Sequence, residues 1–278
     1  MTSRTLWAAL IGLVLMFFAY ASCSIARAQE REQIGLAALN DLIDQTNFIV
    51  GQGCSGTLIS MEHRLILTAH HCVDQNIRVV EREVRQPNGE MKKVRREQSD
   101  RVTVQQRDYR KHEQVGAIAY QTQIVAHRQE RDLALLQLVA DNLRSTAYSR
   151  VLPEDMDILR GDRVTAVGNP RMLDASLTSG VISSVSRSFK MAWTGPDEVP
   201  LIQYDAAASP GSSGGALYDS AGYLIGVTVA GIPGEMALAI PVADVRQLLR
   251  DHCFASVFDA GADDGACREP EKADDAPD

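Results

Sequence analysis

Short apolar runs separated by turn residues dominate the chain from Phe48 to about residue 140, and the same texture returns after residue 160. Runs such as "FIVGQGCSGTLIS", "HRLILTAHHCV" and "DLALLQL" are rich in β-branched residues and glycine, and they show little helical periodicity. This pattern is typical of short antiparallel strands. It predicts two all-β halves, with the segment 141–162 as the connector between them.

Helical periodicity is clear only near the end of the chain. The segment "VADVRQLLRDHC" (242–253) repeats apolar residues at helical spacing, and "QIGLAALNDLIDQT" (33–46) indicates a short helix or lead-in. Within the first half, "QPNGEMKK" carries Asn88-Gly89, a strong turn signal between two polar strands. We therefore expect a hairpin around residue 88 and one terminal helix.

The distribution of charge excludes one class of partner. The 278 residues have a net charge of −8, which argues against nucleic acid as the main partner. Residues 78–112 nevertheless hold eleven Lys/Arg and six Asp/Glu, which we interpret as the solvated faces of a hairpin, with a basic exosite as the alternative. Residues 259–278 hold eight acids and two bases, a composition typical of a flexible, solvating tail.

The N-terminus has the features of an export signal. Arg4 precedes an apolar run from Leu6 to Ala21, and "ARA" fits cleavage after Ala28. Two alternatives are an uncleaved membrane anchor, for which the run is short, and a lipoprotein signal modified at Cys23, for which Tyr20 is unusual. We therefore expect residues 1–28 to be a signal peptide and the protein to be periplasmic or secreted.

Export changes the meaning of the cysteines. Removal of Cys23 with the signal leaves four, an even number suited to disulfides in an oxidising compartment. Four cysteines allow three pairings, and their number alone does not choose among them. Zinc ligation by Cys54 and Cys72 is disfavoured because their separation is far from the short spacing of structural zinc sites.

Three separated motifs carry the candidate chemistry: "TAHHC" (68–72), "RDLALLQL" (131–138) and "SPGSSGGAL" (209–217). Each alone has an ordinary structural explanation, as a core histidine, a strand start or a loop. Together, in this order, they resemble the chymotrypsin-like serine proteases, with the closest likeness to the protease domain of the bacterial HtrA/Deg group. The likeness extends from about Phe48 to Leu249 and includes "VTAVGNP", "LTSGVIS" and "LAIPVADVRQLL".

The resemblance implies a fold and a domain organisation. We expect an all-β fold with two six-stranded antiparallel β-barrels, at about 45–140 and 155–245, followed by a C-terminal helix. The protease domain would span 29–258, and an acidic tail would span 259–278. HtrA relatives carry PDZ domains after the protease, and we expect none here.

The resemblance also assigns catalytic roles, residue by residue. A serine hydroxyl needs a base to become a nucleophile at neutral pH. The family's histidine is the one directly before the cysteine, so His71 would be the general base, Asp132 its orienting acid and Ser213 the nucleophile. The N–H groups of Gly211 and Ser213 would form the oxyanion hole. His70 stands where the family usually has a small residue, and we assign it no catalytic role.

The resemblance implies that the protein is a serine endopeptidase, with a small pocket for the residue before the cleaved bond. Ala207, at the base of the pocket for the residue before the cleaved bond, offers no counter-charge, so we expect a preference for small or medium aliphatic side chains. Val229, Ala230 and Gly231 would pair with the extended substrate. Ser212 stands where zymogen-derived relatives have an aspartate, so we expect no activation by a new N-terminus.

The resemblance implies a disulfide between Cys54 and Cys72, and we expect Cys253 and Cys267 to form a second. We expect polypeptide substrates, no nucleic-acid partner, no membrane span after signal cleavage, and no cofactor or metal. A metal role for His70 and His71 lacks further ligands at metal-binding spacing. The rival class is an inactive pseudoprotease that acts as a binding or scaffolding module.

Overall fold

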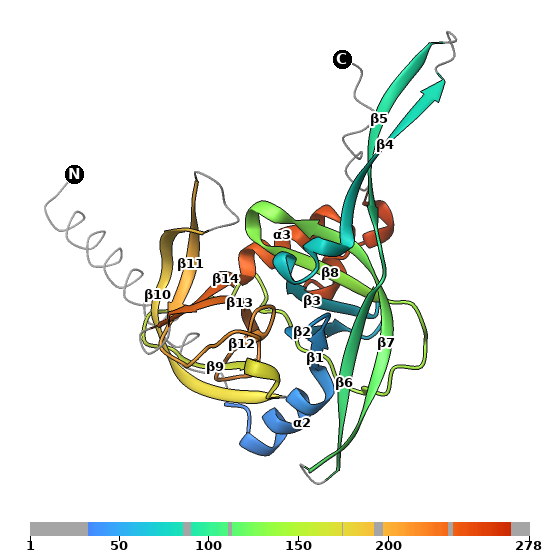
Figure 1. Ribbon diagram of the computed structural model, residues 1–278. Coiled ribbons are helices and arrows are strands. Elements are labelled where there is room, and N and C mark those ends of the chain that lie inside the picture. The colour runs from blue at the N-terminus through green and yellow to red at the C-terminus, as the bar shows by residue number, and fades with distance from the viewer. Residues whose placement is uncertain are drawn as a thin grey trace, which may run out of the picture.

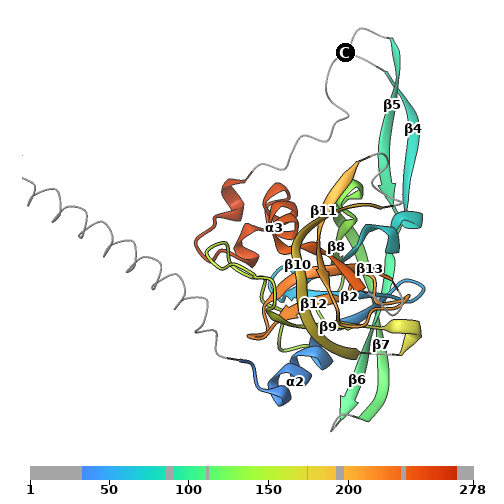
Figure 2. The ribbon, with the colours of Figure 1, turned by 90° about the vertical axis from the view of Figure 1, so that its left-hand side faces the viewer.

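The fold is taken from a computed structural model that describes residues 33–85, 90–110, 113–173, 175–191, 197–232 and 236–267. Two closed barrels pack side by side, and a long hairpin projects from one of them (Figures 1 and 2). Residues 1–28, the expected signal peptide, and the turn at Asn88-Gly89 lie outside the described residues. Among the helices described, none is both long and apolar enough to cross a membrane.

The first barrel is closed by six antiparallel strands. In spatial order they are β1 (Asn47–Val50), β2 (Cys54–Ser60), β3 (Leu65–Ala69), β8 (Leu133–Leu138), β7 (Glu113–Arg128) and β6 (Val102–Arg110). Every residue of β3 is buried, and β8 is buried except at Gln137. The continuous apolar runs of these two strands are explained by their position against the core.

The second barrel repeats this architecture. Its order is β10 (Ser176–Lys190), β11 (Glu198–Tyr204), β14 (Met236–Pro241), β13 (Leu224–Ile232), β12 (Ala216–Asp219) and β9 (Arg163–Gly168). All strand pairs within both barrels are antiparallel. The prediction of two six-stranded antiparallel β-barrels is confirmed.

Two helices of three turns or so accompany the barrels. Helix α2 (Leu36–Thr46) leads into β1, and α3 (Val242–Asp251) follows β14 directly. The apolar face of α3 is buried, and its outer face forms ion pairs with barrel one, Arg131 with Asp244 and Arg128 with Asp251. The predicted C-terminal helix is confirmed, and it ties the end of the second barrel to the segment that precedes Asp132.

Strands β4 (Ile77–Arg85) and β5 (Met91–Ser99) belong to neither barrel. They pair with each other over nine residues and form a separate two-stranded ribbon, which we call the hairpin arm. The sequence indicated a hairpin here, but its polar strands did not show that it would stand apart from the barrel.

Candidate active site

The pairing of β3 with β8 brings the first two candidate residues together. Ala69, the last residue of β3, lies opposite Leu133, the first residue of β8. The residues that follow β3 therefore lie next to those that precede β8. His70 N–H donates to the carbonyl of Asp132 at 3.0 Å, and His71 N–H donates to its carboxylate at 2.8 Å.

His71 and Asp132 form a fixed pair. The Nδ1 atom of His71 lies 2.7 Å from Oδ2 of Asp132, and the Asp132 side chain is fully buried. Asp132 adopts a left-handed conformation with φ 50°, which aims its carboxylate back toward the histidine. A buried carboxylate on Nδ1 holds the ring in one orientation and leaves Nε2 directed elsewhere.

The environment raises the pKa of His71. Burial of the ring opposes protonation, but the hydrogen bond and the charge of Asp132, helped by the charge of Asp74, outweigh that effect. For the neighbouring His70 the balance is reversed. Its pKa is lowered, first by burial and then by the charge of His127, whose ring centroid lies 5.1 Å away. His70 is 7% exposed and packs on His127, so the two adjacent histidines occupy different environments.

Ser213 lies on a tight turn at the junction of the two barrels. Its carbonyl accepts from the N–H of Ser55 on β2 at 2.7 Å, and the next amide, Gly214 N–H, donates to Thr228 on β13 at 2.8 Å. Gly214 has φ 84°, and a Cβ there would lie 2.1 Å from the Ser55 carbonyl oxygen, so only glycine fits. The Ser213 hydroxyl is partly exposed and donates to the Val229 carbonyl at 3.3 Å.

The turn before Ser213 has a conformation suited to anion binding. Gly211 has φ 101°, and a Cβ there would lie 2.5 Å from the carbonyl oxygen of Asn169. The Pro210 carbonyl accepts from Arg171 N–H at 2.8 Å, which orients the peptide that carries the Gly211 N–H. Within the described part of the chain, the N–H groups of Gly211 and Ser213 have no hydrogen-bond acceptor, so both are available to a ligand.

Ser55 and Asn169 hold this turn in place, although neither was predicted to be functional from the sequence. The Ser55 hydroxyl donates to the Gly211 carbonyl at 2.7 Å and accepts from the backbone and side chain of Asn169 at 2.8 and 3.2 Å. Asn169, fully buried, also donates to the Phe48 carbonyl and accepts from Asn47. Both residues stand in quoted motifs, "GCSGTLIS" and "VTAVGNP", but contacts between residues more than 100 positions apart have no signal in a single sequence.

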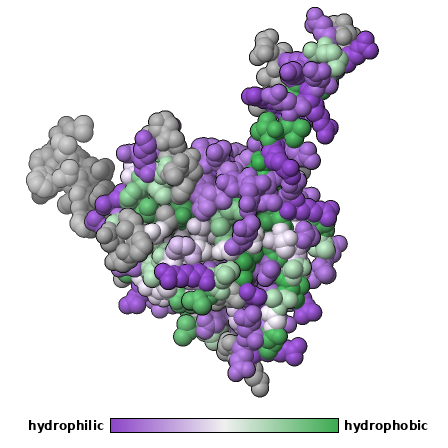
Figure 3. All heavy atoms as spheres, in the orientation of Figure 1, coloured by the Kyte–Doolittle hydropathy of each residue, from purple (hydrophilic) through white to green (hydrophobic). Residues whose placement is uncertain are grey.

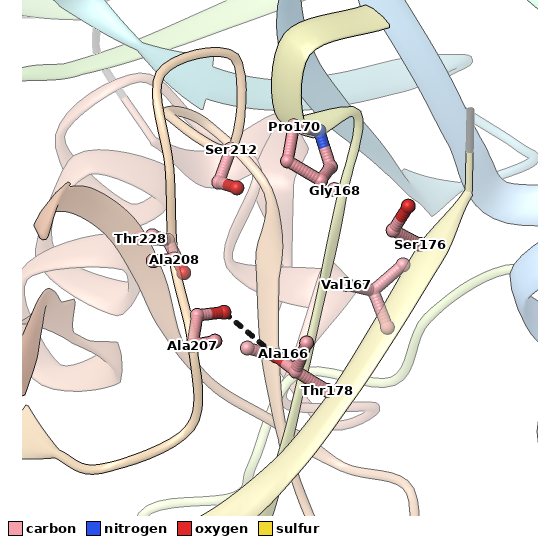
Figure 4. Close-up of a pocket in the computed structure, with 10 residues that line it drawn as sticks. All are labelled: Ala166, Val167, Gly168, Pro170, Ser176, Thr178, Ala207, Ala208, Ser212 and Thr228. Carbon is pink, nitrogen blue, oxygen red and sulfur yellow. Dashed lines mark hydrogen bonds between the residues drawn. The ribbon is translucent and has the colours of Figure 1, made fainter. Parts of the chain in front are cut away.

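A small pocket lies next to this turn and is lined only by uncharged residues (Figure 4). Its interior volume is about 10 Å3, about enough for one water molecule, and it opens to solvent. Ala207 and Ala208 form one wall, and Thr178 donates from its hydroxyl to the Ala207 carbonyl at 2.8 Å. Thr228 on β13 lines the pocket, whereas the expected substrate-pairing residues 229–231 follow it on the same strand and do not line it.

Two cysteine pairs lie at disulfide-bond distance, Cys54 with Cys72 and Cys253 with Cys267. The first joins β2 to the segment that carries His71. Cys54, Cys72 and His71 also form a compact group of potential metal ligands. Because the two sulfurs are bonded to each other, neither is a thiolate, and the group does not fit a metal.

The comparisons with known proteins agree with this geometry. The model of the family described as "Trypsin-like peptidase domain" matches residues 54–227. Protease Do-like 1, chloroplastic, from Arabidopsis thaliana is 38% identical over 133 residues, which cover 45% of this chain and 29% of that protein. A probable periplasmic serine protease do/HhoA-like from Haemophilus influenzae is 31% identical over 206 residues, 70% of this chain and 35% of that protein. The chain thus matches about a third of the length of these curated relatives.

Solved structures support the same fold. The HtrA-type protease AlgW with decapeptide has a TM-score of 0.51 and 27% identity, covering 74% of this chain and 51% of that chain. The MamO protease domain from Magnetospirillum magneticum has a TM-score of 0.54 over 74% of this chain and 96% of that chain. At 18% identity, that second likeness speaks for the fold alone.

Proposed function

Because the chain belongs to the trypsin-like peptidase domain family, we propose that it is an exported serine endopeptidase that hydrolyses peptide bonds through an acyl-enzyme on Ser213. The observation that carries the proposal is the pair formed by His71 and the buried Asp132, 2.7 Å apart, at the barrel junction that also holds the Ser213 turn. A fixed imidazole, a buried carboxylate and an accessible serine are the parts that this reaction needs.

In the proposed reaction, Ser213 Oγ attacks the carbonyl carbon of the scissile bond while Nε2 of His71 takes the hydroxyl proton. Asp132 accepts from Nδ1 and stabilises the imidazolium formed in this step. His71 then returns the proton to the leaving amine, and the acyl-enzyme remains on Ser213. A water molecule, deprotonated by His71 in the same way, releases the acid and regenerates the hydroxyl.

The N–H groups of Gly211 and Ser213 would bind the oxygen that becomes negatively charged in the tetrahedral intermediate. Their lack of other acceptors in the described part of the chain, and the left-handed Gly211, support this role. Each such donor typically lowers the barrier by about 3 kcal/mol. The brace from Ser55 fixes the turn before substrate arrives, so binding need not reorganise it.

The substrate preference that we propose is for small or medium aliphatic residues before the cleaved bond. Ala207 supports it, because a Lys or Arg side chain that reached this residue would meet no counter-charge there. Val229, Ala230 and Gly231, on β13, would pair with the extended substrate backbone. AlgW, a relative with the same fold, has been solved with a decapeptide, which supports polypeptides as the substrate class.

Cleavage of a proteome-derived peptide library tests both activity and preference. We expect cleavage mainly after Ala, Val and similar residues, and none with the Ser213→Ala variant. An Ala207→Asp variant should move the preference toward Lys and Arg by adding a counter-charge. Cleavage by the unmodified protein mainly after Arg or Glu would refute the proposed pocket.

Export is proposed on the basis of the N-terminal pattern and of relatives whose names describe them as periplasmic. Mass spectrometry of the mature protein recovered from a cell envelope fraction should find an N-terminus at Gln29. An N-terminus at a lipid-modified Cys23, or an intact segment 1–28, would each contradict cleavage after Ala28.

One observation favours the alternative of an inactive binding module. The Ser213 hydroxyl donates to the Val229 carbonyl at 3.3 Å, so its proton is directed toward the main chain. In an active enzyme this bond must give way to one with His71. Absence of cleavage with retained binding of the same peptides would favour the binding module.

A further inference from the structure

The hairpin arm is a feature that the proposed catalysis does not use. It extends away from both barrels as a free ribbon (Figures 1 and 2). Nine residues in each strand give it a length of about 30 Å. In the described part of the chain, each of its strands has only the other as a partner, so both outer edges keep unpaired backbone groups.

The strand register separates the side chains of the arm into two faces, because alternate residues of a strand point to opposite sides. On one face the charges are balanced across the ribbon. Glu81 lies opposite Arg95, with Nε 2.8 Å from Oε1, and Glu83 lies opposite Lys93. We call this the paired face.

The other face, which we call the cationic face, has no acid. It consists of Arg78, Val80, Arg82, Val84, Lys92, Val94, Arg96 and Gln98. Its cross-strand neighbours are cations opposite valines, with Arg82 opposite Val94, Lys92 opposite Val84 and Arg96 opposite Val80. Figure 3 shows the arm as a mainly hydrophilic projection with apolar residues among the polar ones.

The stability of the ribbon does not explain the cationic face. Opposite charges across a ribbon stabilise it, and the paired face has this arrangement. On the cationic face, Arg78 pairs with Asp100 at the base, whereas Arg82, Lys92 and Arg96 form no ion pair within the described residues. Three neighbouring cations repel one another and slightly destabilise the ribbon. A bound anionic ligand would explain why they are concentrated on one face.

The arm rises beside the candidate active site. Ile77, its first residue, follows His71 by six positions, with one short 3-10 turn (Asp74–Asn76) between them. At the base, Glu97 contacts His127 at 3.1 Å, and the His127 ring packs on His70. The base of the arm therefore lies near His71, and one end of a chain bound along the arm would lie near it too.

We propose that the cationic face binds an extended polypeptide segment in which acidic and apolar residues alternate along one side, at every second position. Along β4 of the cationic face, cations and valines alternate at every second residue, so a segment paired with the open edge of β4 would place a carboxylate at every fourth residue and an apolar residue midway between two carboxylates. Nucleic acid and anionic membrane do not fit as well, because a row of phosphates would leave the valines between the cations and the open strand edge without partners. Binding of this kind would raise the local concentration of the bound chain near the candidate active site.

Binding is tested with the full-length Ser213→Ala variant, so the result does not depend on catalysis. The probe is a fluorescein-labelled peptide with the repeat Glu-Thr-Val-Thr, about 12 residues long, which places Glu and Val alternately on one side and is long enough to span the arm. Fluorescence anisotropy should show saturable binding that weakens as salt is raised. Replacing Glu by Gln in the probe should abolish it.

The chain offers a matched pair of variants. R82Q/K92Q removes two charges from the cationic face, and R85Q/K93Q removes two from the paired face on the same strands. We expect the first pair to weaken binding about tenfold and the second to change it by about twofold or less. In the active protein, both pairs should cleave a short neutral peptide at the unmodified rate, which shows that the fold is intact.

Three results would overturn the proposal. Equal loss of binding in both variant pairs would show non-specific attraction. Binding of phosphatidylserine vesicles without binding of the peptide would identify a membrane surface instead. Peptide binding that appears only after removal of residues 268–278 would show that the acidic tail of the chain occupies the face.

Discussion

Substitution of Ser55 by alanine tests how the proposed oxyanion hole is held. The change removes one buried hydroxyl that donates to the Gly211 carbonyl at 2.7 Å and accepts from Asn169 N–H at 2.8 Å. A buried group left without a partner costs about 1–3 kcal/mol. We expect the free energy of unfolding to fall by about 2 kcal/mol. The N–H of the fully buried Asn169 would lose its acceptor, whereas the carbonyl of the partly exposed Gly211 could accept from water instead.

The effect on activity should exceed what this stability loss alone would cause. Complete loss of one oxyanion donor lowers kcat by about 10²–10³-fold, and Ser55→Ala loosens the donor without removing it, so we expect kcat to fall about tenfold with little change in KM. The assays are urea unfolding and steady-state hydrolysis of a short ester or peptide. Ser60→Ala is the matched control, because Ser60 is buried on the same strand and its hydroxyl accepts from His63 N–H at 3.1 Å, away from the turn.

The control should lose stability and keep its kcat. If Ser55→Ala retained kcat within twofold of the unmodified protein while losing the stability expected, the brace would have no part in catalysis, and the reasoning would be wrong. Loss of kcat in both variants to the same degree would point to general loosening of the barrel.

Further predictions concern the histidines and the nearby disulfide. His71→Ala should lower kcat by about 10⁴-fold or more, whereas His70→Ala should keep most activity in the same hydrolysis assay. Because His71 must be neutral to accept a proton and its pKa is raised, kcat/KM should fall as pH drops through a midpoint above that of an ordinary histidine; Asp132→Asn should move this midpoint to lower pH. A midpoint unchanged in Asp132→Asn would contradict the assignment. The double variant C54S/C72S should lose about 3 kcal/mol of stability in urea unfolding, the loop-closure contribution for 18 residues of separation, and an unchanged unfolding midpoint would refute that contribution.

The sequence predicted the elements that one strand or one helix specifies locally. Apolar runs such as "LALLQL" identify strands because nearly every residue of β8 is buried. The spacing of Val245, Leu248 and Leu249 identifies α3 because only one face of that helix is buried. The separation of the hairpin arm from barrel one was not predictable. The pattern of apolar and polar residues in a strand reflects which of its residues are buried, and no residue of the arm is fully buried.

The candidate site was predictable only where a motif stands in one piece. The resemblance named His71, Asp132 and Ser213, but the register that joins the ends of β3 and β8 is a property of the folded barrel. The bracing of Gly211 by Ser55 and Asn169 involves hydroxyl and amide groups brought together from two barrels. The contact of His70 with His127 likewise joins residues that no local pattern relates.

Labelling with a fluorophosphonate probe tests whether Ser213 is an activated nucleophile, because the probe reacts with a serine only when a base and an oxyanion hole activate it. We expect one equivalent of label, located by mass spectrometry on the peptide that contains Ser213. We also expect no label in Ser213→Ala and much slower labelling in His71→Ala. Folded protein that takes no label, or label that persists in Ser213→Ala, would contradict the assignment of Ser213 as the nucleophile.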